Sequence, residues 1–138
     1  MMWWTYALLS AFFAALTAIF AKIGIKNIDT DLATAIRSVV ILLLAWGIAF
    51  SRGGTNSINS LSRQNLIFLI LSGAATGLSW IFYFKALQMG KVSQVASIDK
   101  LSVALTILLS VIFLGETLTL KTAIGAACII AGTIMIIL

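Results

Sequence analysis

Long apolar runs, separated by short polar breaks, occupy nearly the whole chain. An α-helix needs about 20 mostly apolar residues to cross the hydrocarbon core of a bilayer. The runs predict spanning helices at about residues 3–22, 31–50, 66–85, 92–114 and 119–138. Because each run is continuous rather than alternating, a β-barrel is excluded. The pattern therefore predicts an all-α integral membrane protein, built as a single five-helix transmembrane domain over residues 1–138.

The breaks between the runs carry charges and turn-forming residues, as in KIGIKNIDT, SRGGTNSINSLSRQN, QMGK and GETLTLK. Three of the four breaks are short, so consecutive helices are expected to be antiparallel neighbours. The first run is too long for a signal peptide, and no basic residue precedes it. Trp3, Trp4 and Tyr6 instead fit the aromatic belt of a membrane interface. We expect a multi-pass protein of the cell's inner membrane.

The composition removes several classes of function. Of the 138 residues 62% are hydrophobic and 9% charged, whereas a soluble domain is nearer half apolar and a quarter charged. There is no histidine, and the single Cys128 cannot form an intramolecular disulfide. Without a metal-ligand cluster or a glycine-rich phosphate loop, the sequence predicts neither an enzyme nor a bound cofactor or metal. No block of basic residues suggests nucleic-acid binding.

The orientation of the chain follows from the lysines and arginines in its short loops. The connections after the second and fourth spans carry Arg52, Arg63 and Lys121. Those after the first and third spans carry Lys22, Lys26, Lys85 and Lys91. This near balance of positive charge has two interpretations. Either the positive-inside rule has low power to predict orientation in so small a protein, or the chain inserts in both orientations. An odd number of spans places the termini on opposite sides, so two copies can form an inverted pair of ten helices.

The second half of the chain carries a family resemblance. FYFKALQMGKVSQVASIDKLSVALTILLSVIFLGETLTLK has an aromatic-x-x-Ala-Leu helix end, a small-residue helix start and then Leu-Gly-Glu. The last run adds Gly-x-x-x-Ile-x-x-Gly. These features resemble the EamA-type repeat of the drug/metabolite transporter superfamily, and the resemblance extends over the whole chain as one repeat. It implies a transporter in which the last helix contacts a second repeat. One departure is Ser97, near which the family often has proline.

Ionisable residues within the predicted spans are the main functional candidates, because such groups are costly in lipid and usually face an interior or a water-filled path. Asp99 and Lys100 lie about 12 Å into the fourth span if its helix starts near Val92; otherwise the first part of the span is irregular and lines a cavity. Arg37 lies about 9 Å into the second span. Adjacent residues on a helix point about 100° apart, so Asp99 and Lys100 are not expected to face each other well. We predict that Asp99 pairs with Arg37 and that Lys100 is the surplus positive charge. The alternative is a purely architectural salt bridge, with Lys100 reaching to the interface.

The remaining polar and small residues suggest lining and packing roles. The third span carries four aromatic residues that either line a solute path or face lipid: Trp80, Phe82, Tyr83 and Phe84. Trp80 and Tyr83 are the candidates to line the path, because their polar atoms need partners. Gly73 and Gly77 form a small-xxx-small motif that permits close helix approach. In the last helix, the residues predicted to pack against a helix or a second subunit are Gly125, Cys128 and Gly132. Glu116 is interpreted as a helix-boundary residue, with Gly115 ending one helix and Thr117 or Thr119 capping the next.

The first span contains no acidic residue, although the related small multidrug resistance proteins use one there to exchange protons for cationic drugs. The sequence therefore predicts a secondary transporter of a small metabolite, an amino acid or a similar zwitterionic or anionic solute. Transport would proceed by alternating access in an inverted homodimer, or with a homologous partner subunit, in the lipid bilayer. Two alternatives remain open: an exporter of cationic or aromatic drugs, and a non-transporting membrane subunit of a larger complex.

Overall fold

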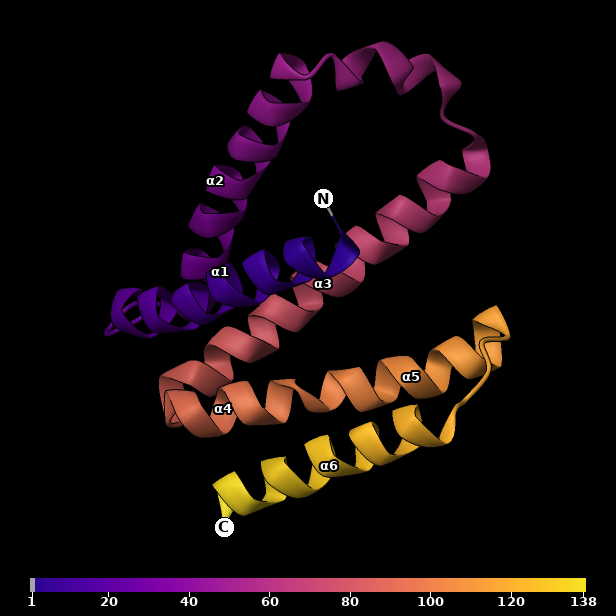
Figure 1. Ribbon diagram of the computed structural model, residues 1–138. Helices are drawn as coiled ribbons and strands as arrows, with labels where there is room; N and C mark the ends of the chain where they lie inside the picture. The colour runs from indigo at the N-terminus through magenta and orange to yellow at the C-terminus, as the bar shows by residue number, and fades with distance from the viewer. Residues whose placement is uncertain (1) are drawn as a thin grey trace. The chain divides into compact units, whose positions relative to one another are not determined.

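The computed structural model describes residues 2–138, and over these residues the chain is helical, with no strand (Figure 1). The helices are α1 (Trp3–Gly24), α2 (Thr30–Ser51), α3 (Arg63–Met89), α4 (Val92–Asp99), α5 (Leu101–Leu114) and α6 (Leu120–Ile137). A 3₁₀ helix, η1 (Gly54–Ser60), interrupts the long polar connection between α2 and α3. Counting α4 and α5 as one span, Val92–Leu114, the described chain has five helices long and apolar enough to cross a membrane. The prediction of five spans is confirmed.

Large apolar side chains on these helices are mostly exposed, and few side chains are buried within the described chain. This is the expected state of a membrane protein considered without its lipid, because lipid tails solvate apolar surface as well as a protein core does. The contacts group the chain into two compact units. One contains α1 up to Phe20 together with Met89–Leu138, and the other is Ala21–Gln88. The single five-helix domain stays a prediction.

In the unit Ala21–Gln88, a small core lies where the α1–α2 connection meets the second half of α3. Ile25, Phe84 and Leu87 are its most buried side chains, at 3%, 1% and 0% exposure. The Gln88 side chain donates hydrogen bonds to the carbonyls of Ile25 at 3.2 Å and Ile28 at 2.9 Å. The Ile25 carbonyl also accepts from the Ile28 amide at 3.4 Å, so the Gln88 amide adds to the hydrogen bonds of an irregular turn and ties that turn to α3.

Local signals in the sequence explain where α2 begins and how the chain turns into it. The Asp29 carboxylate accepts hydrogen bonds from the amides of Asp31 at 3.0 Å and Leu32 at 2.9 Å, which is an N-cap. Just before it, Asn27 has a φ of 62°, a left-handed conformation that asparagine tolerates better than most residues. Lys22, in the last turn of α1, donates to the Leu87 carbonyl. The corner between α1 and α2 is therefore fixed to the end of α3.

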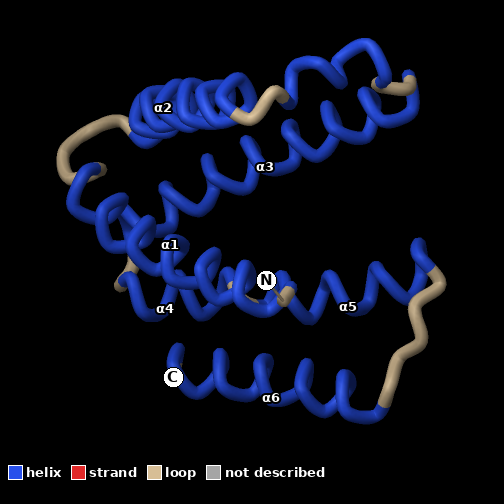
Figure 2. Tube along the Cα trace, turned by 45° about the horizontal axis from the view of Figure 1, so that its top comes forward, coloured by secondary structure: helices blue, strands red, loops and turns tan. Residues whose placement is uncertain are grey.

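In the other unit, α4 and α5 both pack against α6, and Figures 1 and 2 show α5 and α6 running side by side. Gly115 ends α5 with a φ of 69°, and the Thr119 hydroxyl caps α6 by accepting from the Thr122 amide at 3.2 Å. The hydroxyl of Thr133, only 4% exposed, donates to the Ser97 carbonyl of α4 at 3.1 Å. A buried interhelical hydrogen bond thus joins α4 to α6.

The fourth span is broken at Lys100, where α4 ends and α5 begins. The Lys100 amide bonds to the Ser97 carbonyl at 3.1 Å, and the Val103 amide bonds to the Lys100 carbonyl at 3.0 Å. Both are three-residue steps, so the break is one tight 3₁₀-like turn rather than an unwound segment. The sequence predicted a span over 92–114 and allowed for an irregular first part. The irregularity lies instead in the middle, at the charged pair.

Candidate functional site

Arg37 reaches across from α2 to two aromatic rings of α3. Its guanidinium carbon lies 4.4 Å from the centre of the Trp80 ring and 4.9 Å from the centre of the Phe84 ring. Both distances are within the roughly 6 Å at which a cation is attracted to an aromatic face. Because Trp80 and Phe84 are four residues apart on one helix, their rings lie on the same face of α3. We refer to Arg37, Trp80 and Phe84 as the arginine–aromatic cluster.

Two members of the arginine–aromatic cluster were predicted from the sequence as site residues, and the third, Phe84, was not. Arg37 and Trp80 were both predicted as site residues, and the structure brings them together. Tyr83 lies beside the cluster, with its ring centre 6.2 Å from that of Phe84. Phe84 was missed as a site residue, although its spacing from Trp80 is the signal that places both rings on one face. Phe84 is also 1% exposed, so its position is fixed by packing.

The two charges of the fourth span form their own pair. The Lys100 ammonium lies 3.4 Å from an Asp99 carboxylate oxygen, and the side chains are 60% and 39% exposed. The expectation that these neighbours would not face each other was wrong. Lys100 occupies the turn between α4 and α5, and its long side chain folds back to the carboxylate.

The predicted pairing of Asp99 with Arg37 joins residues of different units, Asp99 in the one that ends at Leu138 and Arg37 in Ala21–Gln88. It therefore stays a prediction. Within its own unit, Arg37 shares the chain with two carboxylates, those of Asp29 and Asp31. Asp29 is engaged by the amides of α2, and Asp31 lies in the first turn of the same helix. The Arg37 guanidinium lies over the faces of the two rings, and the neighbouring Tyr83 also interacts with its charge.

The small residues predicted to mediate packing have open space beside them. A methyl group built on Gly73, Gly77, Gly125 or Gly132 would meet no atom within 4 Å in the described chain. Cys128 is exposed. Positions 125, 128 and 132 follow helical spacing and share one face of α6. Thr133, which contacts Ser97, and the half-buried Ala126 and Ile129 lie on an adjacent face. Gly125 and Cys128 are thus exposed beside the face that packs on α4 and α5, and the half-buried Gly132 lies at its border.

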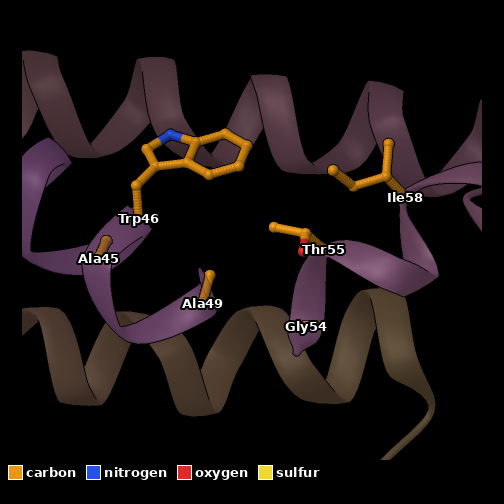
Figure 3. A pocket seen from close by; sticks show the side chains of 6 residues that line it. All are labelled: Ala45, Trp46, Ala49, Gly54, Thr55 and Ile58. Atoms are coloured by element: carbon orange, nitrogen blue, oxygen red, sulfur yellow. The ribbon is translucent and has the colours of Figure 1, made fainter. Parts of the chain in front are cut away.

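Two hollows in the unit Ala21–Gln88 lie outside the predicted site residues. One, of about 280 Å³, lies between the end of α2 and η1; Figure 3 shows the indole of Trp46 on one side of it and Ile58 on the other. Ala45, Ala49, Gly54 and Thr55 complete its lining, which carries no charge. The other, of about 620 Å³, lies at the α1–α2 corner and is lined by Lys22, Ile23, Ile25, Lys26, Asn27 and Gln88. In the second, Lys22 and Gln88 are already used to fix that corner to α3.

Metal chemistry has no candidate here: among the described residues no three histidine, cysteine, aspartate or glutamate side chains gather as a possible metal site. The arrangement offers a positive group held by aromatic rings within one span and a neutral ion pair within another. A guanidinium on a ring face still presents its N–H groups at its edge, and these match a carboxylate in geometry. Such a group is suited to bind an anion rather than to perform covalent chemistry.

Comparison with known proteins identifies the family. The model of the EamA-like transporter family matches residues 1–138. A Sinorhizobium protein named as an uncharacterized transporter is 46% identical over 134 residues, covering 97% of this chain and 95% of that protein. An uncharacterized protein of Methanocaldococcus jannaschii is 37% identical over 71 residues, 51% of this chain and 52% of that protein. No solved structure matches. The chain belongs to the EamA-like transporter family of the drug/metabolite transporter superfamily, and is a multi-pass membrane transporter.

Proposed function

We propose that this chain is a secondary transporter of a small metabolite that carries a carboxylate, an amino acid or a similar zwitterionic or anionic solute. The observation that carries the proposal is the position of Arg37, a positive charge within a membrane span that lies over two aromatic ring faces. A charge at this depth is costly unless a partner offsets it. A solute carboxylate is a partner whose geometry fits the edge of the guanidinium.

Asp99 and Lys100 support the same assignment. Because they neutralise each other at 3.4 Å, they leave Arg37 as the uncompensated charge among the intramembrane groups. The first helix carries no carboxylate to attract a cation. A transporter of cationic drugs would need a negative group along the path, whereas these residues supply a positive one. We therefore favour a carboxylate-bearing solute over the cationic drug.

We propose alternating access in an inverted homodimer as the mechanism. One five-helix chain is small to enclose a solute path, and inverted repeats around a midplane site are a common transporter architecture. The near balance of lysine and arginine between the two sets of loops is compatible with insertion in both orientations. The open face of α6, with Gly125, Cys128 and Gly132, is the surface we assign to the partner copy. Asp99 of either copy then remains a candidate partner for Arg37.

Transport by the purified chain in liposomes tests the function. The probes are radiolabelled zwitterionic amino acids, monocarboxylates and tetraphenylphosphonium, each compared with empty vesicles. We expect uptake of a carboxylate-bearing probe that falls at least tenfold in Arg37→Gln, because the anion loses its charge partner. Arg52→Gln, which removes the same group from the end of the same helix, is expected to keep most activity. Asp99→Asn is measured beside them, with expression and dimerisation checked in every variant.

Three results would contradict the proposal. Uptake unchanged in both Arg37→Gln and Asp99→Asn would remove a direct role for these residues. Uptake of no probe above empty vesicles would favour a non-transporting subunit of a larger complex. Uptake of tetraphenylphosphonium alone would favour the cationic drug exporter.

The membrane orientation of the C-terminus tests the inverted dimer separately. Two reporters are fused after Leu138, one active only inside the cell and one only outside, and are compared at matched expression. Signal from both is the expected result, because the loop charges are nearly balanced. Signal from one reporter alone would exclude an antiparallel homodimer and would direct the search to a separately encoded partner.

A further inference from the structure

Trp80 and Phe84 together have the form of a binding site for a compact cation. Their rings are presented by one face of α3, and the guanidinium carbon of Arg37 lies within 5 Å of both ring centres, at 4.4 Å and 4.9 Å. The face of an aromatic ring carries the negative part of its quadrupole, and indole is the strongest of the natural rings in attracting a cation. The site is therefore present and occupied, and its occupant is a side chain of the same protein.

The end of α3 that carries Phe84 is held by contacts that do not involve the arginine. Phe84 is 1% exposed, and the neighbouring Leu87 is fully buried. The same end of α3 is held by the hydrogen bonds of Gln88 to Ile25 and Ile28 and by the bond from Lys22 to Leu87. Arg37, by contrast, is attached through a long, flexible side chain. Removal of the arginine is therefore expected to leave the two rings in place.

We propose that Trp80 and Phe84 form a cation site that Arg37 fills as a tethered ligand, and that this occupancy keeps organic cations out of the solute path. The selectivity part of this inference rests on the proposed function, since it assumes that the cluster lies on that path. The binding part does not depend on transport. In the wild-type chain an incoming cation meets ring faces that are already covered and a positive charge that repels it. The edge of the same guanidinium attracts a carboxylate. Arg37 alone therefore both excludes organic cations and favours carboxylate-bearing solutes.

Replacing Arg37 with alanine is expected to turn the cluster into a site for free guanidinium. The variant loses the tethered planar cation and keeps the two rings, so the ion that best fills the space has the shape of the missing group. Urea has the same planar shape and nearly the same size but no charge. A comparison of guanidinium with urea therefore separates cation binding from the simple filling of a cavity.

The binding experiment uses the full-length chain in detergent, with Trp3, Trp4 and Trp46 replaced by phenylalanine so that Trp80 is the reporting indole. Guanidinium chloride and urea are titrated over the millimolar range, well below denaturing concentrations, with sodium chloride holding the ionic strength constant. We expect Arg37→Ala to bind guanidinium at least tenfold more tightly than the chain with Arg37 intact, and to show no comparable response to urea. Adding Phe84→Leu, which removes the second ring, is expected to weaken that binding.

Three outcomes would overturn the inference. Guanidinium binding that is equal with and without Arg37 would show that the arginine does not occupy the site. Equal responses to guanidinium and urea would show cavity filling without a cation preference, and binding that survives Phe84→Leu unchanged would place the ion elsewhere. If Arg37→Ala does not fold alone, its folded yield is measured after extraction with millimolar guanidinium or urea. Recovery with guanidinium only is expected, and recovery with neither or with both would also overturn the inference.

The result of the guanidinium titration can be interpreted independently of the transport assay. Guanidinium binding by Arg37→Ala in a chain that moves no solute would support the cation site and contradict the proposed function. Carboxylate transport that needs Arg37, without guanidinium binding in Arg37→Ala, would support the function and contradict the cation site.

Discussion

Two spans of this protein carry charge within the membrane, and they accommodate it in different ways. In α2, Arg37 is a single cation lying against the rings of Trp80 and Phe84. In the fourth span, Asp99 and Lys100 are neighbours that neutralise each other, and the helix breaks at Lys100. The first arrangement leaves a net charge and a regular helix. The second leaves no net charge and an irregular helix.

The difference indicates what each group is able to bind. A cation on aromatic faces keeps its charge and its N–H edge, so it can still attract an anion. An ion pair satisfies both of its members, and each then attracts a third charge less strongly. The comparison therefore supports the proposal that Arg37 recognises the solute. It assigns to the Asp99–Lys100 pair a role in the shape of the fourth span and, if Asp99 changes partner in the assembled transporter, in its conformational change.

The largest effect is expected from breaking the Asp99–Lys100 pair. Asp99→Asn or Lys100→Gln alone leaves one uncompensated charge, which insertion scales place at about 2.5–3.5 kcal/mol near the centre of a spanning helix. The double variant leaves no charge and is expected to recover most of the loss. The measurement is folded yield and unfolding free energy in a detergent or bicelle for both single variants and the double variant.

The same variants decide which partner Asp99 uses in the assembled protein. If Asp99 pairs with Arg37 rather than Lys100, Asp99→Asn will be rescued by Arg37→Gln and not by Lys100→Gln. That pattern of rescue would mean that Arg37 and Asp99 form one charged cluster shared by the second and fourth spans, rather than two separate arrangements.

A smaller effect is expected at the corner that positions the rings of the arginine–aromatic cluster. Gln88→Leu removes two hydrogen bonds, to the carbonyls of Ile25 and Ile28, each worth about 1 kcal/mol. We expect a loss of about 2 kcal/mol in unfolding free energy, together with weaker carboxylate uptake, because α3 is less firmly placed. Gln64→Leu, at the exposed start of the same helix, is the control. Equal stability of the two variants would mean that this corner does not hold α3.

The smallest effect is expected in the other unit, where one hydrogen bond joins α6 to α4. Thr133→Val keeps the shape of the side chain and removes its bond to the Ser97 carbonyl. Interhelical hydrogen bonds in a membrane protein average about 0.6 kcal/mol, so we expect a loss of that order and faster amide hydrogen exchange in α4. Thr106→Val, whose hydroxyl bonds within its own helix to Ser102, is the matched control. Identical exchange in the two variants would show that this bond does not hold α4.

The sequence by itself determined the number of spans, the absence of an alternating pattern and most helix ends, since these depend on local properties. A continuous apolar run can satisfy its backbone in lipid only as a helix. Caps are equally local: Gly115 and Thr119 were expected at the ends of their helices, and the structure confirms both. The family was also readable from local motifs such as Leu-Gly-Glu, and the match over residues 1–138 confirms it.

Only the tertiary structure decided the partners of the charges. Arg37 is 43 residues from Trp80 and 47 from Phe84, so no periodicity within α2 or α3 connects them, and the contact depends on where the long Arg37 side chain reaches in three dimensions. The pairing of Asp99 with Lys100 depended on the turn at Lys100. That turn could not be predicted from a continuous apolar run. A charge takes its partner from whatever lies within a few ångströms of it in three dimensions, whereas hydrophobic length is a property of the chain alone.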